Sequence, residues 1–147
     1  EWEFAGGKSL FDRARQEARE SRIDGRPDIL GSDIDARSID LCKKHAKKAG
    51  VMVNWKVAPL KELSTDKSGG LIVCNPPYGE RMMEKREAEA LYREMRHKFD
   101  ELDNWQVSVI TAYRDFERIY GKRADKRRKL SNGGMVCTMY QYFKRND

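Results

Sequence analysis

Short apolar runs bounded by polar or turn-forming residues recur along the chain and predict four strands. They lie at residues 28–35 (DILGSDID), 51–58 (VMVNWKVA), 69–74 (GGLIVC) and 105–113 (WQVSVITAY). Runs of this length between turn signals are typical of strands rather than helices. The third run is almost entirely apolar, which predicts a strand covered on both of its faces.

Between the strands, apolar residues recur at intervals of three and four, which is the spacing of amphipathic helices. The apolar stripes are Phe11, Ala14 and Ala18; Ile39, Cys42, Ala46 and Ala49; and Ala88, Leu91, Met95, Phe99 and Leu102. Asp35 is placed to cap the second helix and Gly50 to end it. A further short helix is predicted for residues 115–121 (DFERIYG).

The last apolar segment predicts a β-hairpin. Residues 128–143 (RKLSNGGMVCTMYQYF) have the pattern of two strands joined by an Asn-Gly-Gly turn. The complete order of elements is strand, helix, strand, strand, helix, strand, helix and hairpin. This order is typical of an α/β fold around a mostly parallel sheet, to which the C-terminal hairpin adds an antiparallel edge.

Composition narrows the class of protein. Of the 147 residues, 37% are charged and 39% are hydrophobic. No run approaches the roughly 20 apolar residues that are needed to cross a bilayer. Residues 1–25 do not resemble a signal peptide. These features predict a soluble, cytoplasmic protein that has no membrane partner.

The net charge of +6 is concentrated near the end of the chain. Residues 122–129 (KRADKRRK) hold six basic side chains and one acidic side chain, so this segment alone contributes +5. A polyanion is the natural partner of such a segment, with nucleic acid as the first candidate. A solvated approach to the hairpin explains the charge equally well.

Three cysteines, Cys42, Cys74 and Cys137, are far apart in the sequence and lie in apolar surroundings. No two of them have the CxxC spacing, and only His45 and His97 could join them in a metal site. The pattern predicts buried free thiols in a reducing compartment, and no bound metal.

The third strand ends in Asn75-Pro76-Pro77-Tyr78, which a sheet cannot continue because proline has no backbone N–H. In open α/β folds, ligands bind at this carboxyl end of the strands. The Asn75 side chain and the proline carbonyls could accept hydrogen bonds from both N–H groups of an exocyclic nucleobase amine. Tyr78 offers a flat face on which a flipped-out base can stack. The alternative is a proline-rich turn without a site.

A second candidate site lies where the first strand ends. Asp33 stands where a carboxylate can accept hydrogen bonds from both hydroxyls of a ribose, and Ile34 can pack against an adenine ring. The alternative role for Asp33 is that of a helix N-cap, for which Asp35 is better placed. We therefore predict ribose binding by Asp33 and capping by Asp35.

Together these motifs resemble the class I S-adenosylmethionine-dependent methyltransferases that act on amino groups. Within that class, the chain is similar to the ribosomal RNA guanine-N2 methyltransferases with an upstream THUMP domain, which often carry the label of N6-adenine-specific DNA methylase. The similar segments are residues 31–51 (GSDIDARSIDLCKKHAKKAGV), 71–82 (LIVCNPPYGERM) and 123–143 (RADKRRKLSNGGMVCTMYQYF).

The resemblance implies a Rossmann-like methyltransferase sheet and S-adenosyl-L-methionine as the cofactor. It implies that Asp33, Ile34 and Asn75 contact the cofactor. It also implies that residues 75–78 are the catalytic group, which holds the target amine. The implied reaction is methyl transfer to the exocyclic amine of a guanine in large-subunit ribosomal RNA.

The resemblance also favours RNA as the partner of the basic side chains. Lys126, Arg127 and Arg128 are expected to bind RNA phosphates, which would set affinity and salt dependence but not base choice. Glu80 and Arg81 could shape the target pocket or contact a phosphate. They could equally be the polar start of a loop.

Two features depart from the family pattern. Family members begin this domain with a strand and a glycine-rich loop that cradles the methionine part of the cofactor, and neither is recognised in this sequence. Ala58-Pro59 also stands where many relatives carry an acid that binds the adenine amine of the cofactor, so no such role is assigned.

The first departure predicts how the chain is organised. Residues 1–147 are expected to be the C-terminal part of one catalytic domain, with a helical lead-in at 1–28 and the sheet and helices at 29–147. An upstream part of the same polypeptide, with the cofactor loop and a THUMP domain, is expected to supply the missing strand, because two apolar edges would otherwise be unpaired. The alternative is that the segment packs in an unusual way. By itself the segment is expected to be inactive.

Two other functions stay open. The NPPY motif would serve equally well for methylation of the adenine amine in DNA, although the basic C-terminal segment and the lack of a recognisable DNA-reading module favour RNA. A non-catalytic RNA-binding segment is the alternative of a different class.

Overall fold

Residues 6–22, 25, 28–79, 82–132 and 134–143 are described by a computed structural model of the protein. Contacts divide the chain into two compact units. The first comprises Glu1–Gly31 and Arg37–Lys56, and the second comprises Ser32–Ala36 and Val57–Asp147. The NPPY segment and the C-terminal hairpin therefore belong to the same unit.

The first unit contains helix α1 (Gly7–Glu20) and most of helix α2 (Ala36–Ala49). It also contains half of strand β1 (Leu30–Asp33) and most of its pairing partner, strand β2 (Asn54–Val57). The Asn54 amide donates to the carbonyl of Ile29, and the Ala58 amide donates to the carbonyl of Asp33. The offset between donor and acceptor is the same at both ends of the pair, so β1 and β2 run parallel.

The two helices differ in how far their apolar stripes are buried. Ile39 of α2 is buried, as its position in the predicted stripe requires. Helix α1 buries no side chain among the described residues, and Phe11 of its predicted stripe is exposed. Local pairs such as the hydrogen bond from Gln16 to Glu20 support this helix instead.

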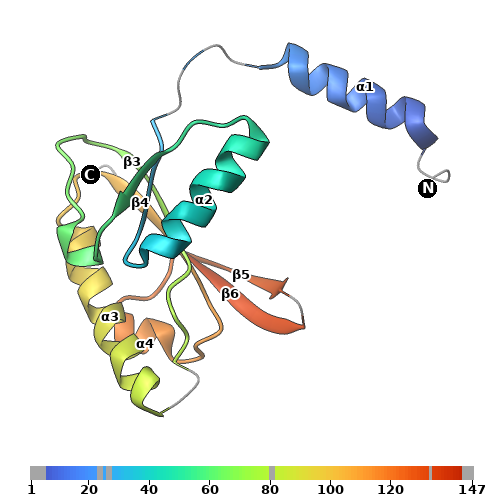
Figure 1. Ribbon diagram of the computed structural model, residues 1–147. Helices are drawn as coiled ribbons and strands as arrows, with labels where there is room; N and C mark the ends of the chain where they lie inside the picture. Colours follow the sequence, from blue (N-terminus) through green and yellow to red (C-terminus); the bar gives the residue numbers. More distant parts are fainter. Residues whose placement is uncertain (1–5, 23–24, 26–27, 80–81, 133, 144–147) are drawn as a thin grey trace. The chain divides into compact units, whose positions relative to one another are not determined.

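The second unit is built on a four-stranded sheet of order β3-β4-β6-β5. The strands are β3 (Gly70–Cys74), β4 (Trp105–Thr111), β5 (Lys126–Asn132) and β6 (Met135–Tyr142). Strands β3 and β4 are parallel, with Cys74 opposite Val109. Strand β6 runs antiparallel to both β4 and β5, and β5 and β6 form the red hairpin of Figure 1.

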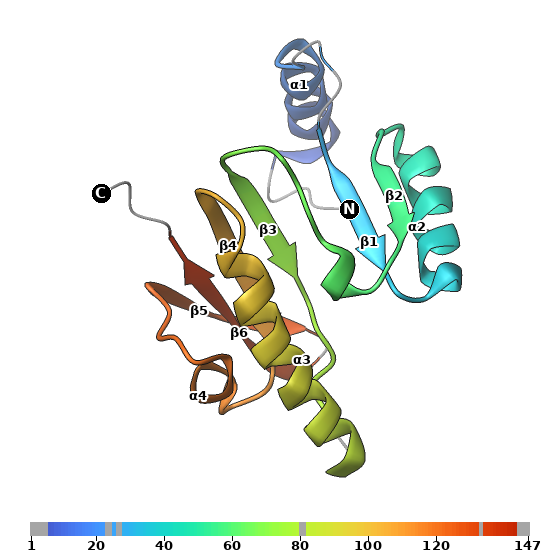
Figure 2. The ribbon, with the colours of Figure 1, turned by 90° about the vertical axis from the view of Figure 1, so that its left-hand side faces the viewer.

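Helix α3 (Met82–Asp100) covers one face of this sheet and runs alongside β3 and β4 (Figure 2). The short helix α4 (Phe116–Tyr120) and the 3-10 turn η2 (Leu60–Glu62) pack against α3. The shared core is rich in aromatic residues: Ala88, Tyr92, Met95, Phe99, Val107, Val109, Phe116, Ile119, Tyr120, Tyr140 and Tyr142.

The opposite face of β3 is open in the described part of the chain. Leu71 and Val73 are both 59% exposed, whereas Ile72 and Cys74 point to the core under α3. The prediction that β3 is covered on both faces is therefore wrong for these residues. Alternation along a strand assigns its side chains to two faces, but it does not show whether other elements cover each face. An apolar run therefore does not reveal whether one face or both are buried.

The α/β fold and the antiparallel C-terminal hairpin were predicted correctly. The third predicted helical stripe ends sooner than expected, because α3 stops at Asp100 and Leu102 is buried beyond the end of the helix. The division into a lead-in at 1–28 and a sheet region at 29–147 stays a prediction.

Candidate functional site

The NPPY corner, which we define as residues 75–78, follows the last residue of β3. Because β3 and β4 are parallel neighbours, the corner lies at the edge of the sheet where β4 also ends. Asn75 and Pro77 are exposed, Pro76 is buried and Tyr78 is partly buried. The corner thus presents an amide side chain to solvent at the place where α/β sheets bind ligands.

Tyr78 ties the corner together from within. Its hydroxyl donates a 2.7 Å hydrogen bond to Asn75 Oδ1 and lies 3.7 Å from Cys137 Sγ of β6. Burial, followed by the contact with Cys137, raises the pKa of Tyr78. The phenol therefore remains a neutral donor, and it fixes the orientation of the Asn75 amide.

Tyr92 of α3 holds the corner from the helix-covered face of the sheet. Its hydroxyl donates a 2.7 Å hydrogen bond to the carbonyl of Pro77 and lies 3.4 Å from Thr111 Oγ1 of β4. Tyr92 was not among the site residues predicted from the sequence. The available signal was a tyrosine adjacent to the apolar stripe of α3, since a buried tyrosine hydroxyl usually has a hydrogen-bond partner.

Gly79 turns the chain from the corner toward α3. Its φ angle is +66°, and a Cβ placed on it would lie 2.6 Å from the Cα of Lys85 and 2.9 Å from the carbonyl oxygen of Glu84. These neighbours are helix backbone and cannot move aside. Glycine is therefore required here both by backbone conformation and by the close approach of α3.

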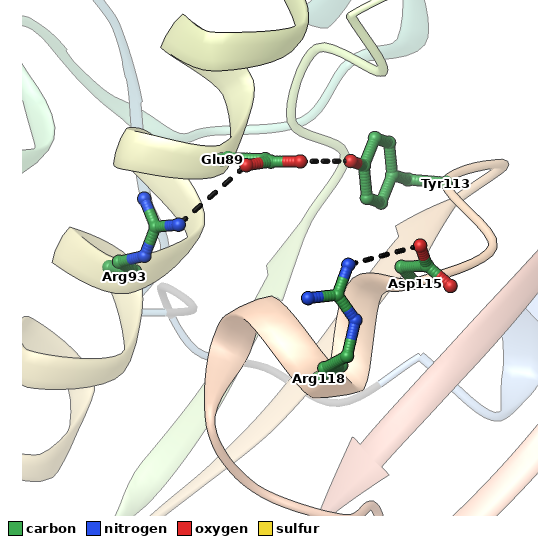
Figure 3. Close-up of polar contacts among 5 residues, drawn as sticks. All are labelled: Glu89, Arg93, Tyr113, Asp115 and Arg118. Atoms are coloured by element: carbon green, nitrogen blue, oxygen red, sulfur yellow. Dashed lines mark hydrogen bonds and ion pairs between the residues drawn. The ribbon is translucent and has the colours of Figure 1, made fainter.

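A polar cluster fixes the loop that follows β4. The hydroxyl of Tyr113 donates to Glu89 of α3, and Glu89 also pairs with Arg93 at 3.6 Å (Figure 3). Arg118 pairs with Asp115 at 3.1 Å in the same loop region. Burial and the neighbouring Glu89 carboxylate raise the pKa of Tyr113 to about 12, so its hydroxyl stays a donor. The cluster fastens the β4–α4 loop to α3.

Lys85 adds a cation to this cluster, with its Nζ 5.7 Å from the centre of the Tyr113 ring. The Tyr113 amide donates to Thr111 Oγ1, the same oxygen that lies near the Tyr92 hydroxyl. The NPPY corner and the β4–α4 loop therefore share one network of hydrogen bonds through Thr111.

Asp33 and Ile34 lie at the carboxyl end of β1, as predicted. Asp33 Oδ1 accepts a 2.8 Å hydrogen bond from the Asp35 amide, which shapes the turn before α2. Asp35 immediately precedes α2, the position that was predicted for its cap. Ile34 is 74% exposed, so its apolar side chain is available to a flat ligand such as an adenine ring.

The basic side chains of β5 fall into two groups. Arg127 makes a two-pronged ion pair with Glu117 of α4, with nitrogen–oxygen distances of 3.0 and 2.6 Å. Because side chains alternate along a strand, Lys126 and Arg128 lie on the other face of β5, and both are exposed. Of the other predicted site residues, Glu80 and Arg81 lie outside the described residues.

The cysteines and other potential metal ligands do not form a shared site. Cys42, Cys74 and Cys137 are free thiols, and Cys137 is the most buried of the three. Within the described ranges, no group of three or more His, Cys, Asp or Glu residues could hold a metal ion. No helix in that part of the chain is long and apolar enough to cross a membrane.

Comparison with protein families gives a match along most of the sequence. The profile described as "RMKL-like, methyltransferase domain" matches residues 3–141. The "Putative RNA methyltransferase YpsC" of Bacillus subtilis is 40% identical over 148 aligned positions, which cover 99% of this chain and 38% of that protein.

More distant relatives and solved structures agree with this match. The "Ribosomal RNA large subunit methyltransferase K/L" of Legionella pneumophila strain Corby is 32% identical, and the alignment covers 90% of this chain and 19% of that protein. The solved structure "Crystal structure of SMU.472, a putative methyltransferase complexed with SAH" superimposes with a TM-score of 0.84 at 36% identity. That superposition covers 95% of this chain and 38% of that chain. The chain therefore spans well under half the length of these relatives.

Proposed function

Because the chain belongs to the family of RMKL-like methyltransferase domains, we propose that the full-length protein methylates the exocyclic amine of a guanine in large-subunit ribosomal RNA. The predicted methyltransferase family and Rossmann-like fold are confirmed. The proposed cofactor is S-adenosyl-L-methionine, and SAH is bound in the similar structure of SMU.472. The observation that carries the proposal is the NPPY corner at the carboxyl end of β3.

The corner offers two hydrogen-bond acceptors to a target amine. The Pro77 carbonyl is directed at the hydroxyl of the buried Tyr92, away from a ligand, so we assign the amine to Asn75 Oδ1 and the carbonyl of Pro76. Asn75 Oδ1 can accept a second hydrogen bond beside the one from Tyr78, because a carbonyl oxygen has two lone pairs. Holding both N–H groups favours a pyramidal nitrogen whose lone pair is free to attack.

The bound cofactor supplies an electrophilic methyl group on its sulfonium. After accepting that methyl group, the amine nitrogen held by Asn75 and Pro76 would lose its proton to solvent. Asp33 and Ile34 fit the ribose and adenine of such a cofactor, since one presents a carboxylate and the other an exposed apolar side chain at the end of β1. Tyr78 is assigned to the target base, on which it would stack.

RNA is the proposed polymer because of the chain's relatives and its charge. The relatives from B. subtilis and L. pneumophila carry names that specify RNA and ribosomal RNA. Lys126 and Arg128 are exposed on one face of β5 and are assigned to phosphates. Arg127 is assigned to the ion pair with Glu117 instead.

The test is a labelling assay on the full-length protein. The enzyme is incubated with methyl-labelled S-adenosylmethionine and either unmodified ribosomal RNA or DNA, and the labelled nucleoside is identified after digestion. We expect label in guanosine from RNA, reduced by about a hundredfold or more in Asn75→Ala because one of the two acceptors is lost.

Asn54→Ala, which removes an asparagine of β2 outside the corner, serves as the matched control and should retain activity. Label in DNA adenine would replace the proposal with adenine methylation of DNA. If neither nucleic acid is labelled but RNA is bound, the protein is an RNA-binding module and the catalytic assignment of Asn75 is wrong.

A further inference from the structure

We propose that Tyr92 is a positioning residue that fixes the NPPY corner for methyl transfer. The effect on activity rests on the proposed function, whereas the effect on the corner itself does not. Tyr92 is completely buried in α3, and its hydroxyl reaches the Pro77 carbonyl at 2.7 Å.

The corner needs an external donor because its own backbone supplies few. Pro76 and Pro77 are consecutive, so two of the four residues in the corner have no backbone N–H. Such a segment cannot be fastened by a ladder or a regular turn of its own. The hydroxyl of Tyr92 provides the missing donor and directs it to the second proline.

The ring of Tyr92 is itself held rigidly. Phe116 and Tyr113 contact it edge-on, with ring centres 5.0 and 5.4 Å away. Thr111 Oγ1 lies 3.4 Å from the hydroxyl on its other side. Burial also raises the pKa of Tyr92, so the hydroxyl keeps its proton. The position of the hydroxyl oxygen is therefore set by the core and not by the corner.

Tyr92 and Tyr78 hold the corner from opposite faces of the sheet. Tyr92 approaches from the face covered by α3. Tyr78 contacts Cys137, which faces away from α3 because it alternates with Thr138 and Tyr140 along β6. With both contacts in place, Asn75 Oδ1 and Pro76 O keep a fixed separation. Loss of the Tyr92 hydroxyl would free the Pro77 carbonyl and shift both acceptors.

The test replaces Tyr92 with phenylalanine in the full-length protein, which removes the hydroxyl and keeps the ring contacts. Tyr142→Phe is the matched control. Tyr142 is also buried, but its hydroxyl donates to the Lys122 carbonyl at 3.3 Å, at the other end of the β4–β6 pair. Circular dichroism confirms that each variant is folded.

We expect kcat of Tyr92→Phe to fall by about tenfold to a hundredfold, because a small misplacement of catalytic groups costs about this much. KM for S-adenosylmethionine should change by less than about twofold, since Asp33 and Ile34, which are assigned to its ribose and adenine, are untouched. Tyr142→Phe should retain its kcat. An unchanged kcat in Tyr92→Phe, or an equal loss in Tyr142→Phe, would overturn the proposal.

A second readout does not depend on methyl transfer. Amide hydrogen exchange at Tyr78 and Gly79 should become at least about tenfold faster in Tyr92→Phe than in the wild-type protein, and should stay unchanged in Tyr142→Phe. If the wild type methylates nothing, the proposed function fails while faster exchange still supports the role of Tyr92. Equal exchange in all three proteins would refute that role.

Discussion

Gly79 shows how a single hydrogen atom in place of a side chain shapes the candidate site. The corner can turn onto α3 only because nothing occupies the position where a Cβ would lie 2.6 Å from the Cα of Lys85. In Gly79→Ala either the corner or the first turns of α3 must move. Because the colliding atoms are backbone, no rotamer change can relieve the contact.

We predict that Gly79→Ala lowers the free energy of unfolding by about 2–4 kcal/mol, which is more than the roughly 1 kcal/mol typical of alanine in a left-handed conformation. Gly121→Ala is the matched control. Gly121 lies in the same unit with a φ of +81°, but nothing lies within 4 Å of its added Cβ. Urea denaturation measures both variants. An equal decrease in the free energy of unfolding in both variants would mean that the close approach of α3 to Gly79 does not affect stability.

At this scale the sequence revealed only part of the site. Asn75, Pro76, Pro77 and Tyr78 stand out because two prolines end an apolar strand, which is a local signal. The partners of the corner are not local. Cys137 has the appearance of an ordinary buried thiol, and Tyr92 that of an ordinary core aromatic. Their roles depend on contacts formed only when α3 and β6 reach the corner.

Strand β5 presents its basic residues in alternation, and this divides them by role. Lys126 and Arg128 extend from one face, and Arg127 extends from the other to meet Glu117. The sequence placed Lys126, Arg127 and Arg128 in one basic segment, because the net charge of a segment does not show on which face of a strand each side chain lies. The acidic partner of Arg127 comes from α4, and Glu117 also accepts from the Ala124 amide.

We therefore predict opposite phenotypes for neighbouring substitutions. Lys126→Ala and Arg128→Ala should each reduce the slope of log affinity for RNA against log salt concentration by about 1, with little change in stability. Arg127→Ala should leave that slope unchanged and lower stability by about 1 kcal/mol through loss of the ion pair. Filter binding over a salt series and thermal unfolding provide the two measurements. An equal slope change in Arg127→Ala would show that the ion pair opens when RNA binds.

Most elements were predictable because their signals lie within each segment. The stripes of α2 and α3 carried the helical period, and β3, β4 and the final hairpin were marked by short apolar runs between turn signals. The structure has helices and strands in these segments. The open face of β3 was not predictable. Leu71 and Val73 have the same apolar character as Ile72, and only the packed structure shows which of them α3 covers.

The molecule as a whole combines buried titrating groups with a small core, which predicts sensitivity to alkali. Burial raises the pKa of Cys74 from 9.0 to about 12, and that of Tyr120 from 10.0 to about 12. Folding therefore favours the protonated form of both groups. Their contribution to stability is complete below pH 9, and it is lost as the pH rises from 9 toward 12.

Between pH 9 and 10 Cys74 should dominate this loss, since the tyrosines have the higher ordinary pKa. We expect the free energy of unfolding to fall by up to about 1.4 kcal/mol per pH unit in this window. In Cys74→Ala this slope should be shallower, whereas the neighbouring Val73→Ala should retain it. Urea titrations at pH 8.5, 9.5 and 10.5 would test this. An unchanged slope in Cys74→Ala would show that the thiol is not the titrating group.

The contact between Tyr78 and Cys137 also has a consequence for biosynthesis. It joins residues 59 positions apart, and the strand that carries Cys137 is the last to leave the ribosome among the described elements. When the NPPY corner and α3 have left the ribosome, the corner can contact Tyr92 but still lacks its contact with Cys137. The corner therefore acquires both of its contacts only when translation of this segment is almost complete. A chain whose synthesis ends before β6 has a corner that lacks the contact with Cys137.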